Sequence, residues 1–328
     1  MTSPHTFHIP VMGLAYTIDS PIKVARFGIP SVISIVEDKL IEMMRQYYYK
    51  QTGKAFIAIT PSEPDYRAKR ITDYLNLVNE IVQEQVAQLK ASAFEAQSDL
   101  VKYFEMLPDN SFLKQCFLHL KNEKDADTRT EKEAWLKQQV VPGSIDVNIM
   151  TKVDKDNFGE DGSLLENGSD ALSSLRGYMN SNLSQSSIIF SAGLNPRLYN
   201  YLESFPQLQP RDGVFQKKIV IKVSDYRSAL IQGKYLAKKG IWVSEFRIES
   251  GLNCGGHAIA TDGYFLGPIL QEFIDKKEEL CEALFSIYKP VIESKTGQTL
   301  EAPYPIRLTV QGGIGTYEET VLLQELYG

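Results

Sequence analysis

Short apolar runs alternate with amphipathic stretches along most of this chain. The apolar runs are rich in β-branched residues and predict buried strands, while apolar positions three or four residues apart predict helices between them. A run that is apolar on both faces, such as SVISIV at 31–36, is typical of a parallel sheet covered by helices on both sides. The pattern predicts eight strands, near residues 10, 33, 57, 147, 189, 221, 245 and 309.

Alternating strands and helices define an α/β protein, and eight such strands suit a TIM (β/α)8-type barrel. A barrel of this kind typically needs about 250 residues. The chain of 328 residues has that length outside the segment 62–141. One of the eight strands can instead lie outside the barrel wall. In that case the chain supplies seven strands of the barrel and stops before the last one. We predict a single barrel domain over 1–328, with this truncation left open.

The segment 62–141 interrupts the alternation, because it contains no good strand. Apolar residues at the spacing of one helix face are Ile71, Leu75, Val78, Val82 and Val86. Two more helical regions are expected, one at 98–121 with a break near Pro108 and one at 131–139. We interpret 62–141 as a helical insertion whose apolar residues form a core.

Composition narrows the classes of protein to consider. The net charge is −6 and no basic block stands out, so nucleic acid is not expected as a partner. No apolar run approaches the ~20 residues that span a membrane, and the N-terminus does not resemble a secretory signal. The three cysteines are far apart, and cysteines and histidines show no zinc-binding spacing. We therefore expect a reduced, cytoplasmic protein with neither a disulfide framework nor a metal site.

The stretch 242–267 carries the strongest candidate chemistry. A strand that ends at Glu249 is followed by a turn in which Gly255 and Gly256 precede His257. Adjacent glycines let a flat ligand come close, and in α/β chains ligands bind where strands end. His257 could act as a general acid or base, or only hydrogen-bond a ligand. A plain glycine-rich turn is the alternative.

A second glycine-rich turn follows the last predicted strand. Gly312, Gly313, Ile314 and Gly315 lead into a terminal helix. The backbone N–H groups of such a turn, together with the helix N-terminus, suit a phosphate. In barrels, phosphate sites often lie after the seventh and eighth strands. A tight strand-to-helix turn without a ligand is the alternative.

Several polar or small residues in otherwise apolar strands complete the candidate site. Lys222 lies inside KIVIKV and points either into the barrel near its mouth or to solvent. An inward ammonium needs an anionic partner, such as an electron-rich cofactor ring. Asn148 raises the same question on its own strand, and Glu249 could orient a ligand hydroxyl. Met12 and Gly13, at the end of the first predicted strand, allow a flat ring to approach the backbone.

Five segments together resemble the nitronate monooxygenase (2-nitropropane dioxygenase) family of FMN-dependent barrels. They are PVMG at 10–13 with the following SPIKVARFGIPSVISI, IIFSAGLNPRL at 188–198, KIVIKVSDYRSALIQGKYLAKKGI, ESGLNCGGHAI at 249–259 and VQGGIGT at 310–316. They occur in the family's order and cover most of the chain outside 62–141. The Leu-Asn-Cys insertion before Gly255 departs from the family pattern, as does the lack of a counterpart to the final Gly-Thr-bearing strand.

The resemblance implies an FMN-dependent oxidoreductase, a flavoprotein of monooxygenase type. FMN would have its phosphate at Gly312, Gly313 and the neighbouring turn, and His257 would be the acid/base toward a small carbanion-forming substrate. Two alternatives stay open: an NAD(P)H-dependent flavin barrel similar to enoyl reductases, and a non-catalytic module that binds a phosphate ligand. The expected partner is a small-molecule substrate, and a homo-oligomer is left open.

Overall fold

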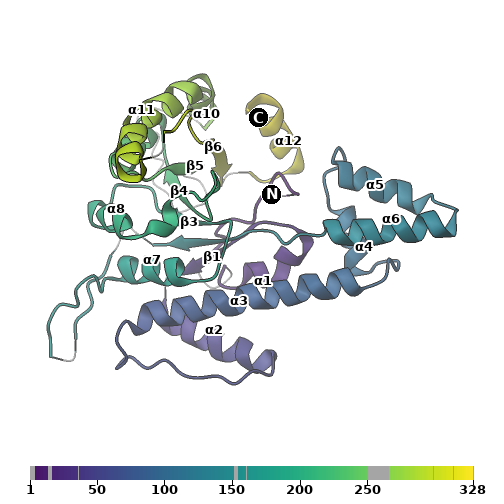
Figure 1. Cartoon of the computed structure of the whole chain (residues 1–328), viewed down its shortest axis with the longest axis horizontal. Helices are drawn as coiled ribbons and strands as arrows, with labels where there is room; N and C mark the ends of the chain where they lie inside the picture. The colour runs from purple at the N-terminus through teal and green to yellow at the C-terminus, as the bar shows by residue number, and fades with distance from the viewer. Residues whose placement is uncertain are drawn as a thin grey trace. The chain divides into compact units, whose positions relative to one another are not determined.

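The computed structural model describes residues 4–13, 17–35, 37–150, 154–159, 161–249, 266–297, 299–312 and 314–327. Within them the protein is α/β, with a six-stranded parallel sheet and flanking helices (Figure 1). The strands are β1 (Ser31–Ile35), β2 (Ile145–Ile149), β3 (Ser186–Phe190), β4 (Lys217–Val223), β5 (Val243–Glu249) and β6 (Arg307–Gln311). They lie in the sheet in chain order, and over the described residues the sheet does not close into a barrel.

Two of the eight predicted strands are wrong. Over the described residues 4–13, the backbone near residue 10 forms a single parallel bridge, between Ile9 and Ser31. Near residue 57, AFIAIT has the composition of a strand, but the structure assigns no strand there. The carbonyl groups of Ile57 and Ile59 accept hydrogen bonds from arginine side chains instead. Local composition predicts how readily a segment extends, whereas its partners are set by the fold.

The chain divides into two compact units. Unit 1 comprises Met1–Val147 and Asn180–Ser186, and unit 2 comprises Asn148–Met179 and Ser187–Gly328. Whether 1–328 acts as one domain with an insertion at 62–141 stays a prediction.

Four of the helices of unit 1, α2 and α4 to α6, begin at a residue whose side chain caps them. Glu37 accepts hydrogen bonds from the backbone N–H groups of Lys39 and Leu40, and Ser98 accepts one from Val101. The helices are α1 (Ser20–Val24), α2 (Asp38–Gln51), α3 (Tyr66–Ala91), α4 (Asp99–Glu105), α5 (Phe112–Lys121) and α6 (Ala126–Gln139). The predicted break near Pro108 falls between α4 and α5.

The end of α3 and the helices α4 to α6 share a core of their own. Its aromatic centre is formed by Tyr103, Phe104 and Phe117, and the rings of Phe104 and Phe117 stack with their centroids 5.4 Å apart. Val86 and Leu89 supply the contribution of α3. The apolar residues of this segment therefore form a core, as their spacing predicts.

Unit 2 alternates strands and helices in the predicted order. Its helices are α7 (Asp170–Asn180), α8 (Pro196–Tyr201), α9 (Tyr226–Ala237), α10 (Leu266–Asp275), α11 (Lys277–Thr296) and α12 (Tyr317–Tyr327). Helices α10 and α11 lie along one side of β4, β5 and β6 (Figure 1). Among all the described residues, none of the helices combines the length and apolar character needed to cross a bilayer.

Lys217 opens β4 and is buried in unit 2. Its ammonium donates a hydrogen bond of 2.7 Å to the carbonyl oxygen of Tyr178 and lies 4.3 Å from the centroid of the Tyr178 ring. Burial lowers the pKa of Lys217 to about 8, because removing a charge from water favours the neutral amine.

This burial predicts a change of stability with pH. Between pH ~8 and ~10.4 the unfolded chain binds more protons at Lys217 than the folded chain, so the free energy of unfolding rises with pH in this window, by up to about 3 kcal/mol. Lys217→Met removes that contribution. Urea unfolding at pH 7 and pH 10 should show the wild type gaining stability relative to the variant. An unchanged difference between the two proteins would contradict the prediction.

Candidate functional site

One face of β4, β5 and β6 is polar. The strand register places Lys222 beside Arg247, Arg247 beside Thr309, and Glu249 beside Gln311. Side chains alternate between the two faces of a strand, so Glu245 shares this face with Arg247 and Glu249. The polar cluster, as we name it, consists of these residues of the face, none of them exposed: Lys222, Glu245, Arg247, Glu249, Thr309 and Gln311. Arg307, which the register places beside Glu245, is exposed and is not part of it.

The opposite face of these strands is apolar and packs against helices. Phe246 and Ile248 are buried there. Helix α9 comes close because it has a glycine at position 233. A Cβ at Gly233 would meet Leu284 of α11 at 2.8 Å and Phe246 at 3.1 Å. Since α9 and α11 occupy the apolar face, the polar cluster lies on the side of the sheet away from them.

Lys222, Glu249 and Gln311 form the part of the cluster at the carboxyl ends of the strands. The Lys222 Nζ atom lies 3.2 Å from Oε1 of Glu249, and these side chains are 10% and 6% exposed. The Gln311 Nε2 atom donates a 3.1 Å hydrogen bond to the same oxygen. The structure therefore brings together Lys222 and Glu249, two of the predicted site residues, as a buried ion pair held by an amide.

Arg247, Glu245 and Thr309 form a second group, toward the other ends of β5 and β6. The Arg247 Nε and Nη2 atoms donate to Oε1 of Glu245 at 2.9 and 2.7 Å. The Thr309 hydroxyl donates to the same oxygen at 2.6 Å. All three contacts fix the Glu245 carboxylate, and both charged residues are buried.

The formal charges of the cluster cancel, because two cations face two carboxylates. Isolated charges would be costly to bury, whereas paired and hydrogen-bonded ones are tolerated. A ligand on this face would meet ammonium, guanidinium and amide donors next to carboxylate acceptors. Such a surface is suited to a planar polar group with both donors and acceptors, and offers little net attraction to an anion.

The predicted phosphate turn follows directly after β6. Gly312 has φ +83°, a backbone conformation that favours glycine. The N–H groups of Gly315 and Thr316 donate to Oε2 of Glu319 at 2.6 and 3.1 Å, while Thr316 Oγ1 accepts from the N–H of Glu319. This is a capping box at the start of α12. A phosphate held by these N–H groups would have to displace the Glu319 carboxylate; Ile314, the other described residue of this turn, is half-buried.

Met12 and Gly13 belong to unit 1. Their backbone N–H groups donate to Thr17 Oγ1 at 3.0 and 3.2 Å. The Met12 side chain is 65% exposed. Asn148 lies in β2, is buried, and begins the first segment of unit 2. The remaining predicted site residues, His257, Gly255, Gly256 and Gly313, lie outside the described residues.

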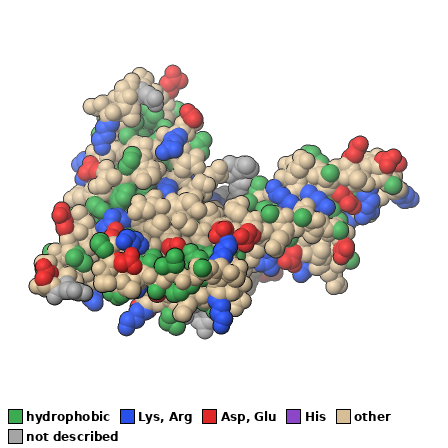
Figure 2. Space-filling view, turned by 60° about the horizontal axis from the view of Figure 1, so that its bottom comes forward, with side chains coloured by type: hydrophobic (Ala, Val, Ile, Leu, Met, Phe, Trp, Pro, Cys, Tyr) green, Lys and Arg blue, Asp and Glu red, His purple; other side chains and the backbone are tan. Residues whose placement is uncertain are grey.

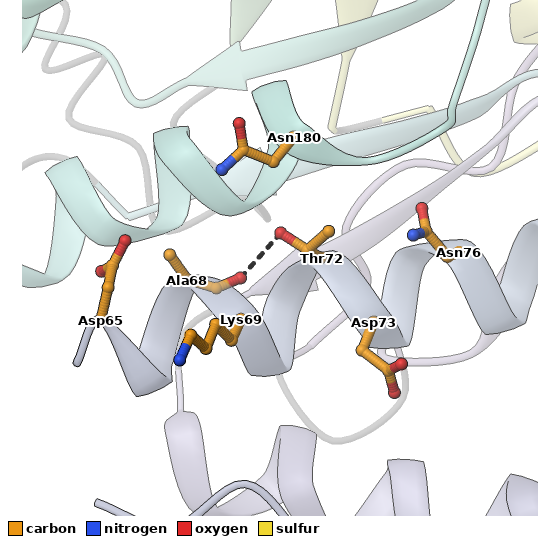
Figure 3. A pocket seen from close by; sticks show the side chains of 7 residues that line it. All are labelled: Asp65, Ala68, Lys69, Thr72, Asp73, Asn76 and Asn180. Atoms are coloured by element: carbon orange, nitrogen blue, oxygen red, sulfur yellow. Dashed lines mark hydrogen bonds between the residues drawn. The ribbon is translucent and has the colours of Figure 1, made fainter. Parts of the chain in front are cut away.

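A shallow pocket of about 260 Å³ lies in unit 1, along α3 (Figure 3). It is lined by Asp65, Ala68, Lys69, Thr72, Asp73, Asn76 and Asn180. Two of its polar side chains have partners within the protein: Thr72 donates to the Ala68 carbonyl, and Asp73 accepts from Arg45 and Tyr49. None of the predicted site residues lines it, and we assign it no ligand.

Sequence reasoning missed four members of the polar cluster: Glu245, Arg247, Thr309 and Gln311. Glu245, Arg247 and Glu249 alternate with Phe246 and Ile248 along β5, so a period-two pattern of charges was available as a signal. Thr309 and Gln311 carry no such signal. Their role follows from the pairing of β6 with β5.

Among the residues that the structure describes, no group of three or more histidine, cysteine, aspartate or glutamate side chains is arranged to hold a metal ion. Comparison of the chain with protein-family models, with curated proteins and with solved structures finds no match.

Proposed function

We propose that this chain is an FMN-dependent oxidoreductase, similar to nitronate monooxygenases, that acts on a small carbanion-forming substrate. The observation that carries the proposal is the buried arrangement of Lys222, Glu249 and Gln311 at the carboxyl ends of β4, β5 and β6. In α/β proteins, ligands bind outside the carboxyl ends of the strands. The barrel itself, with the polar cluster in its interior, is part of the proposal.

The donor set of the cluster fits a flavin ring. The pyrimidine edge of an isoalloxazine presents carbonyl and ring-nitrogen acceptors on either side of one N–H donor. Lys222 and Gln311 can donate to such acceptors, and the Glu249 carboxylate can accept from the N–H. A face that carried only positive charge would suit a phosphate better than this edge. The charge balance of the cluster therefore supports the ring as its ligand.

Bound FMN would supply an acceptor for two electrons, and the protein would supply position and electrostatics. The Lys222 ammonium would stabilise negative charge that develops on the ring, while Glu249 and Gln311 hold the ammonium in place. His257 is the proposed acid/base toward the substrate, and the turn at Gly312 the proposed phosphate site. A phosphate at that turn, whether of FMN or of another ligand, would have to displace the Glu319 carboxylate from the N–H groups of Gly315 and Thr316.

Absorption between about 350 and 500 nm, where oxidised flavin absorbs, tests the proposal. Wild-type protein titrated with FMN should develop a perturbed flavin spectrum with one FMN per chain. Replacing the ion pair by Lys222→Gln together with Glu249→Gln keeps a buried hydrogen-bonded pair without charge. This double variant should bind FMN at least about tenfold more weakly, which corresponds to ~1.4 kcal/mol.

Lys238→Gln is the matched control, because Lys238 is an exposed lysine directly after α9. It should bind FMN as the wild type does. Oxygen consumption with a nitronate would then support the monooxygenase hypothesis. Rapid flavin reduction by NADPH would support the reductase hypothesis. Absence of FMN binding by the wild-type chain would count against the flavoenzyme.

A further inference from the structure

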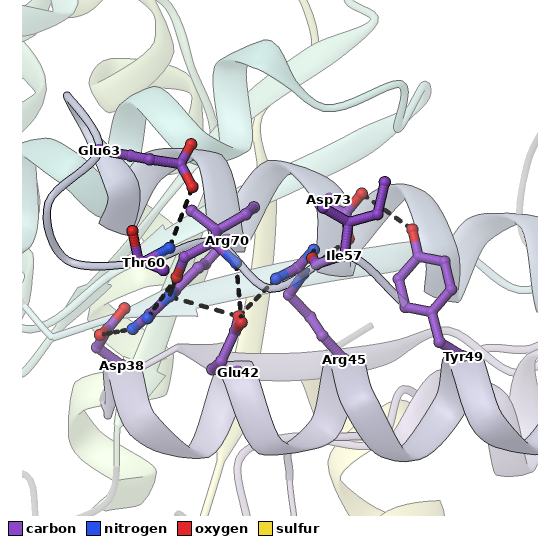
Figure 4. A network of polar contacts seen from close by, with 10 residues as sticks. Asp38, Glu42, Arg45, Tyr49, Ile57, Thr60, Glu63, Arg70 and Asp73 are labelled. Atoms are coloured by element: carbon purple, nitrogen blue, oxygen red, sulfur yellow. Dashed lines mark hydrogen bonds and ion pairs between the residues drawn. The ribbon is translucent and has the colours of Figure 1, made fainter. Parts of the chain in front are cut away.

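Two buried arginines hold the segment 54–60 along α2 and α3 (Figure 4). The Arg45 Nη2 atom donates to the carbonyl oxygen of Ile57 at 3.1 Å, and Arg70 Nε donates to that of Ile59 at 2.8 Å. The N–H of Ile59 donates to Glu42 Oε1 at 3.1 Å. Three of the four backbone N–H and C=O groups of residues 57 and 59 on this inner edge are therefore bound by side chains.

The arginines are themselves fixed by carboxylates. Arg45 pairs with Asp73 at 2.7 Å and with Glu42 at 2.5 Å, and Arg70 pairs with Asp38. Burial raises the pKa of Asp38, and its arginine neighbours oppose this shift. Hydrogen-bonded, desolvated ion pairs of this kind resist rearrangement because breaking one strands a buried charge. The segment is thus held in place along its inner edge.

The outer edge of the same segment is open. In an extended chain the N–H and C=O groups of successive residues point to opposite edges. Those of Phe56 and Ala58 therefore lie opposite the arginines, and they have no hydrogen-bond partner among the described residues. The side chain between them, Ile57, is 76% exposed. Figure 2 shows hydrophobic side chains at the surface in a view from the side that carries α2.

This open edge lacks the features that usually prevent pairing with another strand. Exposed strand edges in soluble proteins carry charges, prolines or bulges. Residues 55–60, AFIAIT, contain no charged residue and no proline. A fixed, β-prone edge of this kind is a template for adding a strand.

We propose that the segment 55–60 pairs with the same segment of a second copy of this chain, as an antiparallel two-stranded ribbon about a two-fold axis at Ile57. Phe56 of one copy would then face Ala58 of the other, and the reverse. Each such pair exchanges two backbone hydrogen bonds, so the four open N–H and C=O groups of each copy are satisfied. The two Ile57 side chains meet at the axis, in the closely spaced pair position.

The absence of charge on the segment favours a second copy as its partner. An isologous contact brings the same surface of both copies together, so a segment with charges of one sign would repel itself. The segment 55–62 has no charged residue. Its charged flanks are already paired within the chain, Lys54 with Glu80 and Glu84, and Glu63 with Lys69.

Sedimentation equilibrium of the full chain tests the proposal. The wild type should form a species of twice the chain mass of 37.0 kDa. Ile57→Lys and Ile57→Asp each place like charges at the axis and should raise the dimer dissociation constant at least about tenfold. Mixing the two variants should restore dimers, because opposite charges then meet. A monomeric wild type at about 100 μM, or single variants that still dimerise fully, would overturn the proposal.

Two further variants separate the contribution of the backbone hydrogen bonds to dimerisation from that of the Ile57 side chain. Ala58→Pro removes an N–H from the outer edge and should weaken the dimer, whereas Ala55→Pro removes one from the inner edge and should not. Met43→Lys is the surface control, since Met43 is also exposed, at 65%. Circular dichroism of each variant shows whether it is folded. Equal dimerisation by Ala58→Pro and Ala55→Pro would exclude pairing through this edge.

Discussion

Gly143→Ala is expected to lower the free energy of unfolding by more than about 4 kcal/mol, or to prevent folding. A Cβ at Gly143 would lie 2.1 Å from the carbonyl oxygen of Ile29, 2.2 Å from its carbonyl carbon and 2.6 Å from the nitrogen of Pro30. All three are backbone atoms, so no side-chain rotation relieves the clash. This close approach of Gly143 to Ile29 lies two residues before β2, so it positions the chain where that strand begins.

Hydrogen bonds on either side of the contact hold the two segments together. The N–H of Gly143 donates to the Ala25 carbonyl at 2.8 Å, and the N–H of Ser31 donates to the Ser144 carbonyl at 3.0 Å. Moving the segments apart to admit a methyl group would lengthen both bonds, and leaving buried backbone groups unpaired costs about 1–3 kcal/mol each.

Urea unfolding measures this effect, with Gly267→Ala as the matched control. Among the described residues, a Cβ at Gly267, in α10, meets the Tyr327 hydroxyl at 3.5 Å, an ordinary contact. The control should change stability by no more than about 1 kcal/mol. If the Gly143→Ala protein is as stable as the control, the close approach of residue 143 to Ile29 is not required for the stability of the fold.

Lys222→Met is the second substitution with a large expected effect. Among the residues that the structure describes, it leaves the buried Glu249 carboxylate with the Gln311 amide as its side-chain hydrogen-bond donor. Removing one partner of a buried ion pair typically costs about 3–5 kcal/mol, because the other charge remains desolvated. The free energy of unfolding at pH 7 should fall by that amount.

A double-mutant cycle separates the lost pair from lost packing. Replacing Glu249 by leucine in the Lys222→Met background removes the stranded charge and should recover most of the stability, since buried ion pairs can often be replaced by apolar residues. Lys238→Met, at an exposed position, should change stability by less than about 0.5 kcal/mol. If the double variant is no more stable than Lys222→Met, the carboxylate is not what destabilises the single variant.

The amino-acid sequence by itself determined the α/β class, six of the eight predicted strands and the helices between them. These features depend on local periodicity and on capping residues, which a sequence displays directly. It also singled out Lys222, because a charge inside an apolar strand requires a partner, and Glu249, because it ends its strand.

Only the tertiary structure decided which groups those partners are. The register of β4, β5 and β6 joins Lys222 to Glu249 and brings in Gln311, 62 residues further along the chain. The same applies to AFIAIT, which has the composition of a strand but whose carbonyl groups are bound by Arg45 and Arg70. The composition of a segment determines how readily it extends, whereas hydrogen bonds between distant segments depend on the whole fold. For this physical reason, neither the Lys222–Glu249–Gln311 contacts nor the arginine contacts of AFIAIT could be predicted from the local pattern.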